Sequence, residues 1–415
     1  MNTSGRVLFL STFFIILFVY TMFAAGTPHG RSPNEQSRLE LSVSLAKYGS
    51  VAIDPVVATY GTPFDRAIRD GRTYSDKAPG LSLLGVPVLW LASPFLPRED
   101  KSDLPSYWSV RHLLTWLLVT LPATLFPFLA LNRYGSKLTP RKKNGVILLF
   151  ALITPVLTYS GVLFGHVPAG VLAGLAWLMA LDPGRESWKP SAGGAAISGL
   201  LLAAAATIEY PTAIVGPVLL LTMALHGAPV RTLAAFAGAF AVGLVPCLIY
   251  HDIAFGSPFR TGYAFKSDWW HGTIHQTGFA GVSIPRFESL WGVLAGARRG
   301  MLFYCPLLIL VPLGLLQMER QKKNSSWPFI AMGVLYILFA AGFLDWQAGW
   351  SAAARHLVPF VFLCIFPLAS AVELITRPGQ NTILQWVLSF AAGCSLAGTF
   401  LSLSLSPFFP EHFSS

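Results

Sequence analysis

Long apolar runs separated by short polar loops dominate the sequence. The first run extends from Val7 to Ala25, and ten more of spanning length follow, at about 110–132, 145–163, 168–182, 191–207, 212–226, 232–250, 301–317, 328–344, 355–373 and 381–404. The runs are continuous rather than alternating, which is typical of membrane-spanning helices and not of the strands of a membrane barrel. The pattern predicts an all-α polytopic membrane protein with about eleven transmembrane helices, in a single integral membrane domain over residues 1–415.

The segment Pro79–Leu96 is apolar and long enough to span, but it carries three prolines and is followed by a fourth, Pro97. If it does not cross, the short basic loops "RYGSKLTPRKK", "DPGRESWKP", "HGAPVR", "MERQKKNSS" and "ITRPGQ" all face the cytoplasm, as the positive-inside rule favours. If it crosses, all of them face outside. We adopt the first interpretation. It places two long loops outside, a first outer loop at 26–109 with interfacial helices and a second outer loop at 251–300.

The N-terminal run could belong either to a signal peptide or to a first span. Arg6 precedes it, and "FAAG" at its end is a candidate cleavage site. The run is longer than the 7–15 residues of a usual signal-peptide core, which favours an uncleaved span.

Composition agrees with a membrane protein. Hydrophobic residues make up 53% of the chain and charged residues 12%, against about 25% charged in a soluble domain. The net charge of +10 favours lipid headgroups or anionic ligands over nucleic acid. The chain contains no GxxxxGK[ST], HExxH, CxxC or GxSxG pattern. The sequence therefore identifies no cofactor, and it leaves a requirement for a divalent metal open.

The first outer loop is unusually rich in charge for so apolar a chain. Its first part carries Glu35, Arg38, Glu40, Lys47 and Asp54, and its second part Arg66, Arg69, Asp70, Arg72, Asp76 and Lys77. Between 35 and 47, apolar residues recur at helical spacing, with Asn34 as a candidate N-cap. This pattern predicts an amphipathic helix on the membrane surface. The simplest interpretation of any one of these charges is a solvated position without a special role.

Two stretches of this loop resemble a known family. "NEQSRLELSVSLAKYGSVAID" followed by "YSDKAPG" is similar to the first outer loop of GT-C glycosyltransferases that use polyprenyl-phosphate sugars. That group includes the lipid A aminoarabinose transferase, the protein O-mannosyltransferases and the rhizobial lipopolysaccharide transferases. The matching positions are Asn34-Glu35, Arg38, Gly49, Asp54-Pro55, Tyr74, Lys77 and Pro79. "FGSPFRTGY", "RRGMLFYCPLL" and "WQAGWSAAARHLVPF" resemble later parts of the family in the same order.

The resemblance implies an inverting glycosyltransferase of hexosyl or pentosyl type. It would move a sugar from a polyprenyl-phosphate donor to a lipid, polysaccharide or protein acceptor. The site would face the exterior or periplasm of a bacterial plasma membrane, among membrane lipids. The family has an acidic pair where this chain has Asn34-Glu35, so the role of the catalytic base falls to Glu35. Where the family has "GpR", this chain has "AAR", which keeps Arg355 but not the glycine.

The remaining candidate site residues are cations for the lipid phosphate and further carboxylates. Arginine offers phosphate a two-pronged fork and lysine offers a point charge. The candidate phosphate ligands are Lys77, Arg38, Arg298, Arg299 and Arg355. The candidate acceptor or second carboxylates are Asp54, Asp76 and Glu209. Alternatively, Arg298 and Arg299 extend from a membrane end to the headgroups, and Glu209 is a residue of a short turn.

A multi-pass transporter or flippase of a lipid-linked or small solute is the alternative function. Such proteins typically show inverted repeats and charges near the bilayer midplane. This sequence shows no repeat, and its charges gather at the ends of the apolar runs. That distribution favours an enzyme acting at the membrane surface.

Overall fold

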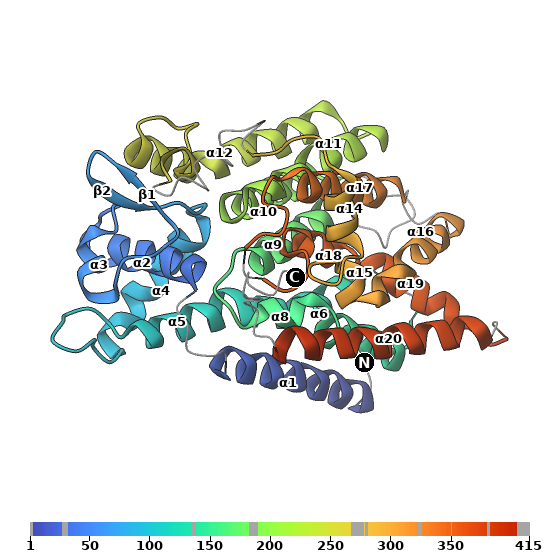
Figure 1. Cartoon of the computed structure of the whole chain (residues 1–415). Coiled ribbons are helices and arrows are strands. Elements are labelled where there is room, and N and C mark those ends of the chain that lie inside the picture. Colours follow the sequence, from blue (N-terminus) through green and yellow to red (C-terminus); the bar gives the residue numbers. More distant parts are fainter. Residues whose placement is uncertain are drawn as a thin grey trace.

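The structure is a computed structural model in which nearly every element is a helix (Figure 1). It describes residues 3–26, 32–134, 138–181, 190–266, 278, 281–321, 326–349, 351–379 and 382–404. The expected all-α architecture is confirmed, with one short hairpin added to it. Part of the predicted second outer loop, 267–277, lies outside the described residues.

All eleven predicted apolar runs are helical. The first half of the chain supplies α1 (Thr3–Gly26), α5 (Tyr107–Thr115), the π-helical η2 (Trp116–Thr120), α6 (Leu121–Arg133), α7 (Pro140–Leu152), α8 (Pro155–Ser160), α9 (His166–Ala180), α10 (Ala192–Ile208), η3 (Tyr210–Ile214) and α11 (Val215–Leu225). The second half supplies α12 (Val230–Phe255), α14 (Phe287–Leu294), α15 (Met301–Tyr304), η5 (Pro306–Leu310), α16 (Val311–Arg320), α17 (Trp327–Gly342), η6 (Arg355–Leu357), α18 (Val358–Leu363), α19 (Ile365–Ile375) and α20 (Thr382–Ser404).

Fewer of these helices are long enough to cross a membrane than the sequence predicted. Among the described residues, four continuous helices are long and apolar enough to cross a membrane, namely 5–26, 107–133, 230–255 and 382–404. The pair α18–α19, bent by 57°, adds a fifth, and five shorter apolar helices have 10–17 residues. Prolines account for several of the breaks, because a proline lies at the first or second residue of α8, η3 and η5 and cannot continue a preceding helix. The prediction of about eleven spans therefore describes eleven helical runs, several of them short or broken.

The polar elements of the first outer loop gather at one end of the helical body. They are α2 (Pro33–Tyr48), α3 (Asp54–Tyr60), β1 (Arg66–Arg69), β2 (Arg72–Ser75), α4 (Gly80–Ala92) and the short η1 (Ser93–Phe95). In Figure 1 they lie at the left, whereas α16 and α19 lie at the right. Helix α4 packs against α2, at the end where α5 begins (Figure 1). Helix α4 is one of the shorter apolar helices, so whether 79–96 crosses the membrane stays a prediction.

Helix α2 differs from the expected surface helix. Every residue from Asn34 to Ser44 is buried, so the polar side chains do not form a solvated face. The correction has a physical reason, since these side chains have buried partners in neighbouring elements instead of water. The helix begins with Ser32 as N-cap rather than Asn34, and Pro33 occupies its first turn. It ends at Gly49, whose φ of 61° is a left-handed conformation that glycine adopts readily.

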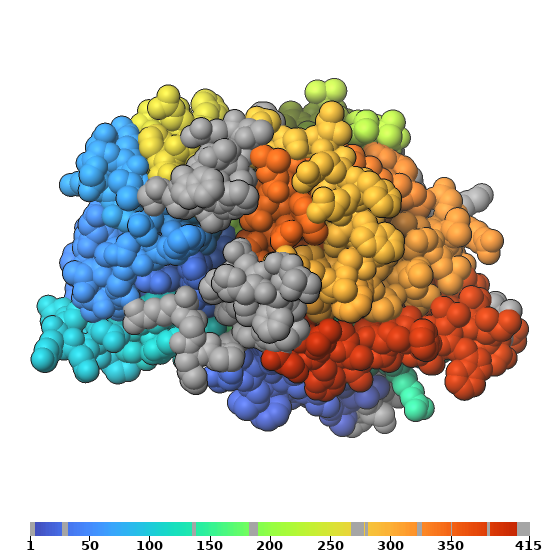
Figure 2. Space-filling view, in the orientation of Figure 1, coloured from blue at the N-terminus to red at the C-terminus, as the bar shows by residue number. Residues whose placement is uncertain are grey.

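The hairpin β1–β2 was not expected from the sequence. Its strands pair in antiparallel register, with Arg66 opposite Ser75, and Asp70-Gly71 form the turn with positive φ at both positions. An isolated bridge joins Ala67 to Lys266, just after η4 (Gly262–Phe265). In the space-filling view the surface of this loop meets the segment that follows α12 (Figure 2). The hairpin thus ties the first outer loop to the start of the second.

Candidate active site

Two lysines and two aspartates form a compact ring of charge beside the hairpin. Lys77 Nζ lies 2.9 Å from Asp65 Oδ2 and 3.4 Å from Asp76 Oδ1. Lys266 Nζ lies 2.9 Å from Asp76 Oδ2 and 3.9 Å from Asp65 Oδ1. The side chain of Asp76 is fully buried and that of Asp65 is 16% exposed. We call these four residues the Lys–Asp ring.

The hairpin explains why these residues meet. Asp65 directly precedes β1, and Asp76 and Lys77 directly follow β2. Antiparallel pairing places Arg66 opposite Ser75, so the residues flanking the pair lie together at the open end of the hairpin. Lys266 joins them through its backbone bridge to Ala67.

The ring keeps its charges at neutral pH. Burial raises the pKa of Asp65, but Lys77 and Lys266 outweigh this and lower it to about 2. Burial lowers the pKa of Lys77, but Asp65 and Asp76 outweigh it, and the pKa rises above its usual value. The two lysines and two aspartates of the ring are equal in number, so their formal charges balance.

Arg355 adds a positive charge beside this balanced ring. Its charge contributes a downward shift to the pKa of both Asp65 and Lys77. For Lys77 the two aspartates outweigh that contribution, and the net pKa stays raised. The guanidinium lies over the ring of Phe164, 5.8 Å from the centroid. Within the described part of the chain, its buried Nε has no hydrogen-bond partner. Arg355 thus gives the site a net positive charge and one unused donor.

A second group of polar side chains links α2 to the end of α10. Arg38 Nη2 lies 2.7 Å from Glu209 Oε1, and Arg38 Nε donates to Asn34 Oδ1 at 3.0 Å. Arg38 also donates to the carbonyls of Ala78 and Ile208 at 3.2 and 3.3 Å. Its guanidinium is therefore occupied by internal partners, which leaves it little capacity for a ligand phosphate.

The Glu209 carboxylate is less enclosed than its partner. Its Oε2 lies 3.8 Å from His166 Nδ1, and the rings of His166 and His356 are in edge contact at 5.5 Å. The Glu209 side chain is 14% exposed. A Cβ atom at Gly165 would overlap this carboxylate, so the absence of a side chain there makes room for it.

Glu35 lies apart from the Lys–Asp ring and is not at an exposed bilayer surface. Its Oε1 lies 3.1 Å from Arg111 Nη2 and accepts a hydrogen bond from the Leu163 backbone at 2.8 Å. Arg111 also donates to the carbonyls of Ala24 and Gly161. The pair joins α2, α5 and the ends of α1 and α8, which is a structural arrangement.

Three other predicted site residues lie outside the ring. Arg299 is buried and donates to the carbonyls of Gln347 and Gly349 at 2.7 and 2.5 Å. Arg298 is its neighbour and supplies a carbonyl that accepts from Arg299 Nη1. Asp54 accepts a hydrogen bond from the Thr73 backbone at 3.0 Å and so holds α3 to the hairpin.

The structure thus brings together Lys77, Asp76 and Arg355, and separately Arg38 and Glu209. Sequence reasoning did not single out Asp65, Lys266, Arg111 or His356, because no local spacing marks residues that meet only through the fold. Lys266 follows closely on "FGSPFRTGY", one of the stretches that resemble the GT-C family. Among the described residues, no group of three or more His, Cys, Asp or Glu side chains is arranged to hold a metal ion.

Apolar helices enclose a buried polar site at one end of the molecule (Figure 1), an arrangement that we compared with known proteins. No family profile matches the sequence, and no curated protein matches it. The solved structure of ArnT from Cupriavidus metallidurans bound to undecaprenyl phosphate is similar over 98% of this chain and 77% of that one, with a TM-score of 0.57 and 13% identity.

The oligosaccharyltransferase of Archaeoglobus fulgidus in its apo form is also similar. It matches 96% of this chain with a TM-score of 0.52 and 12% identity. This chain covers 56% of that protein's length, so the likeness leaves much of the larger protein without a counterpart. Similarity at these identities establishes the fold, and the GT-C resemblance seen in the sequence is confirmed at that level.

Proposed function

We propose that this protein is a membrane glycosyltransferase that moves a sugar from a polyprenyl-phosphate donor to a lipid, polysaccharide or protein acceptor. The observation that carries the proposal is the Lys–Asp ring with Arg355 beside it, at one end of a GT-C fold. A solved protein of that fold has undecaprenyl phosphate bound. A buried lysine and a partly unpaired arginine suit the phosphate of such a donor.

Lys77 and Arg355 would hold the phosphate that leaves during transfer. In an inverting displacement, the acceptor oxygen forms a bond to the anomeric carbon while the bond from that carbon to the phosphate oxygen breaks. The electron pair of the broken bond stays on the polyprenyl phosphate, which gains negative charge. Cations positioned before the reaction stabilise this charge in the transition state. Asp65 and Asp76 keep Lys77 protonated in its buried position until the donor arrives.

Glu209 is the carboxylate that we propose as the base for the acceptor proton. Its Oε2 is not held by Arg38, its side chain is partly exposed, and His166 and His356 lie beside it. The sequence favoured Glu35 for this role. Each glutamate has one oxygen in an ion pair, but the geometry favours Glu209 because its side chain is 14% exposed, against 2% for Glu35.

The site would face the exterior, or the periplasm in a bacterium. Support comes from the sequence, because the positive-inside rule assigns the short basic loops between the apolar runs to the cytoplasm. The sugar and the acceptor stay open, since no described residue selects among them.

Transfer by the purified protein tests the proposal. The protein in liposomes would be offered polyprenyl-phosphate sugars carrying a radiolabel, with a bacterial lipid extract as acceptor. We expect labelled acceptor with wild type and none with empty liposomes. Failure to transfer from any donor, in protein that melts cooperatively, would contradict the proposal and favour the transporter alternative.

A further inference from the structure

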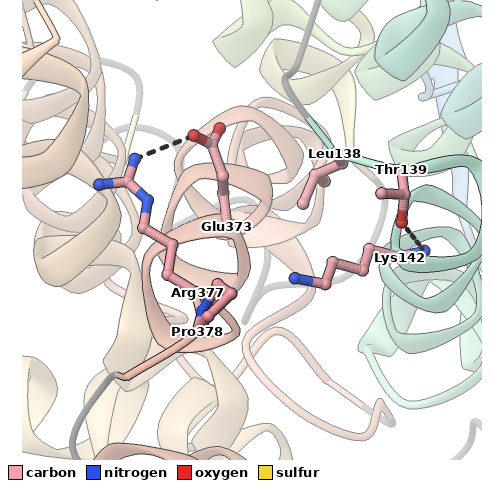
Figure 3. A pocket seen from close by; sticks show the side chains of 6 residues that line it. All are labelled: Leu138, Thr139, Lys142, Glu373, Arg377 and Pro378. Carbon is pink, nitrogen blue, oxygen red and sulfur yellow. Dashed lines mark hydrogen bonds and ion pairs between the residues drawn. The ribbon is translucent and has the colours of Figure 1, made fainter.

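A cavity of about 430 Å³ lies among helix ends far from the Lys–Asp ring. It is lined by Leu138, Thr139, Lys142, Glu373, Arg377 and Pro378, from the start of α7 and the end of α19 (Figure 3). In Figure 1 this end of α19 lies opposite the end that carries the hairpin. Its volume is within the range of small-ligand sites, about 300–1,000 Å³. The glycosyltransferase proposal assigns it no role.

The walls of the cavity carry both signs of charge. Lys142 extends from α7 toward α19, and its Nζ donates to the carbonyl of Thr376 at 2.6 Å (Figure 3). Arg377 Nη2 lies 3.0 Å from Glu373 Oε1. A lysine ammonium has three donors and a guanidinium five, so both cations keep donors for a ligand. These donors suit a phosphate oxygen.

Glu373 shows a second, independent sign of a ligand. Only 7% of the Glu373 surface is exposed, and its Oε2 has no hydrogen-bond partner among the described residues. Gln321 donates to Glu373 Oε1 at 3.0 Å, and its own Oε1 is likewise buried without a partner in the described part of the chain. The buried Glu373 oxygen without a donor carries a desolvation cost that a donor-rich ligand in the cavity would remove.

We propose that this cavity binds a phosphoethanolamine group, with its phosphate at Lys142 and Arg377 and its ammonium at Glu373. A primary ammonium has three hydrogen-bond donors and a positive charge, which match the open carboxylate oxygen of Glu373. The cavity lies at the ends of apolar helices, where lipid headgroups lie. The source that fits this position is therefore the headgroup of a membrane phospholipid such as phosphatidylethanolamine.

Lipid retention measured by native mass spectrometry tests this proposal. The full-length protein would be equilibrated in nanodiscs with equal amounts of phosphatidylethanolamine, phosphatidylcholine and phosphatidylglycerol, and the retained lipids counted after release. Phosphatidylcholine keeps the phosphate and the charge but has no N–H donor, and phosphatidylglycerol has no amine. We expect wild type to retain phosphatidylethanolamine about tenfold over phosphatidylcholine, as a hydrogen bond to a charged group implies.

Variants separate the two halves of the site. Glu373→Gln is expected to remove the preference for phosphatidylethanolamine over phosphatidylcholine, whereas Lys142→Met is expected to lower retention of all three lipids. Arg141→Ala is the matched control, since Arg141 is exposed on the same helix and does not line the cavity. Because Lys142→Met leaves Glu373 intact, the proposal stays testable even if Glu373→Gln lowers the melting temperature.

Soluble phosphoethanolamine distinguishes a lipid headgroup from a free ligand. We expect it to displace retained phosphatidylethanolamine only at millimolar concentration. Equal retention of all three lipids by wild type, or an unchanged preference in Glu373→Gln, would overturn the proposal. Tight binding of soluble phosphoethanolamine without retention of the lipid would overturn its assignment to a lipid.

Discussion

Lys77 Nζ lies 2.9 Å from Asp65 Oδ2, a contact made by the residues that flank the two strands of one hairpin. A buried lysine alone tends to lose its proton, because desolvation disfavours the charged form. Asp65 and Asp76 reverse that tendency and keep the ammonium ready for an anion. In the function proposed above, this contact would prepare the site for a lipid phosphate before one binds.

Donor affinity should change its pH dependence when Asp65 is neutralised. In wild type the pKa of Lys77 is raised above its usual value of 10.5, so the ammonium stays charged at lower pH. Donor affinity should therefore stay constant from about pH 6 to 9. In Asp65→Asn the main countercharge is gone, burial dominates, and affinity should fall several-fold as pH rises across that range. Binding titrations at each pH measure this. A flat profile in Asp65→Asn would show that Asp65 does not control the charge of Lys77.

The same contact predicts how stability responds to acid. The pKa of Asp65 is lower in the folded state, so its contribution is present above about pH 4 and is lost as pH falls toward 2. The contribution of Lys77, whose pKa is raised on folding, persists below its usual value and is lost only above it. The melting temperature of wild type should therefore decrease more between pH 5 and pH 2.5 than that of Asp65→Asn. Melting curves in detergent that fall in parallel would contradict this.

Two arginines that the sequence treated alike should behave differently. Arg299 donates to three backbone carbonyls in a buried position, so Arg299→Ala should cost about 3 kcal/mol or more of unfolding free energy. Arg355 has a buried Nε without a partner in the described chain, so Arg355→Ala should leave melting almost unchanged and raise the donor KM about tenfold. Thermal melts and initial rates on both variants test the contrast. A donor KM unaffected in Arg355→Ala would remove that residue from the site.

The two glutamates offer a test of the base. Glu209→Gln should lower kcat by about 10²–10⁴ at an unchanged donor KM, the range for loss of a general base. Glu35→Gln should instead destabilise the fold by about 3–5 kcal/mol, because Arg111 is left buried without its countercharge. Rates corrected for the folded fraction separate the two. If Glu209→Gln has full activity per folded molecule and Glu35→Gln has none, then Glu35 and not Glu209 is the catalytic base.

Gly165 provides a subtler test of the Glu209 position. A Cβ atom there would overlap the carboxylate, so Gly165→Ala should displace Glu209 without removing it. We expect kcat to fall at least tenfold while the donor KM stays within about twofold, since a small misplacement of a reacting group is costly. Gly145→Ala is the control, because a Cβ atom at Gly145 meets nothing within 4 Å. Equal kcat values in both variants would contradict a catalytic role for the Glu209 carboxylate.

The fold could be predicted largely from hydropathy, because an apolar run in lipid has few options besides a helix. The site could be predicted only in part. Lys77 was found through its motif, whereas Asp65 and Lys266 meet it only because a hairpin and a distant bridge bring them together. The charges of α2 were misjudged for a similar reason. Arg111 and Glu209, which pair with that helix, lie far away in sequence, so its burial could not be inferred locally.

Direct binding of undecaprenyl phosphate tests the central claim, that Lys77 holds the lipid phosphate of the donor. The measurement is a titration of purified wild type, Lys77→Ala and Lys47→Ala in nanodiscs. Lys47 is exposed in the same loop, so its variant controls for loss of a positive charge. We predict affinity lowered about 100-fold in Lys77→Ala, as for loss of one strong charged contact, and unchanged in Lys47→Ala. Equal affinity in wild type and a folded Lys77→Ala would contradict the account.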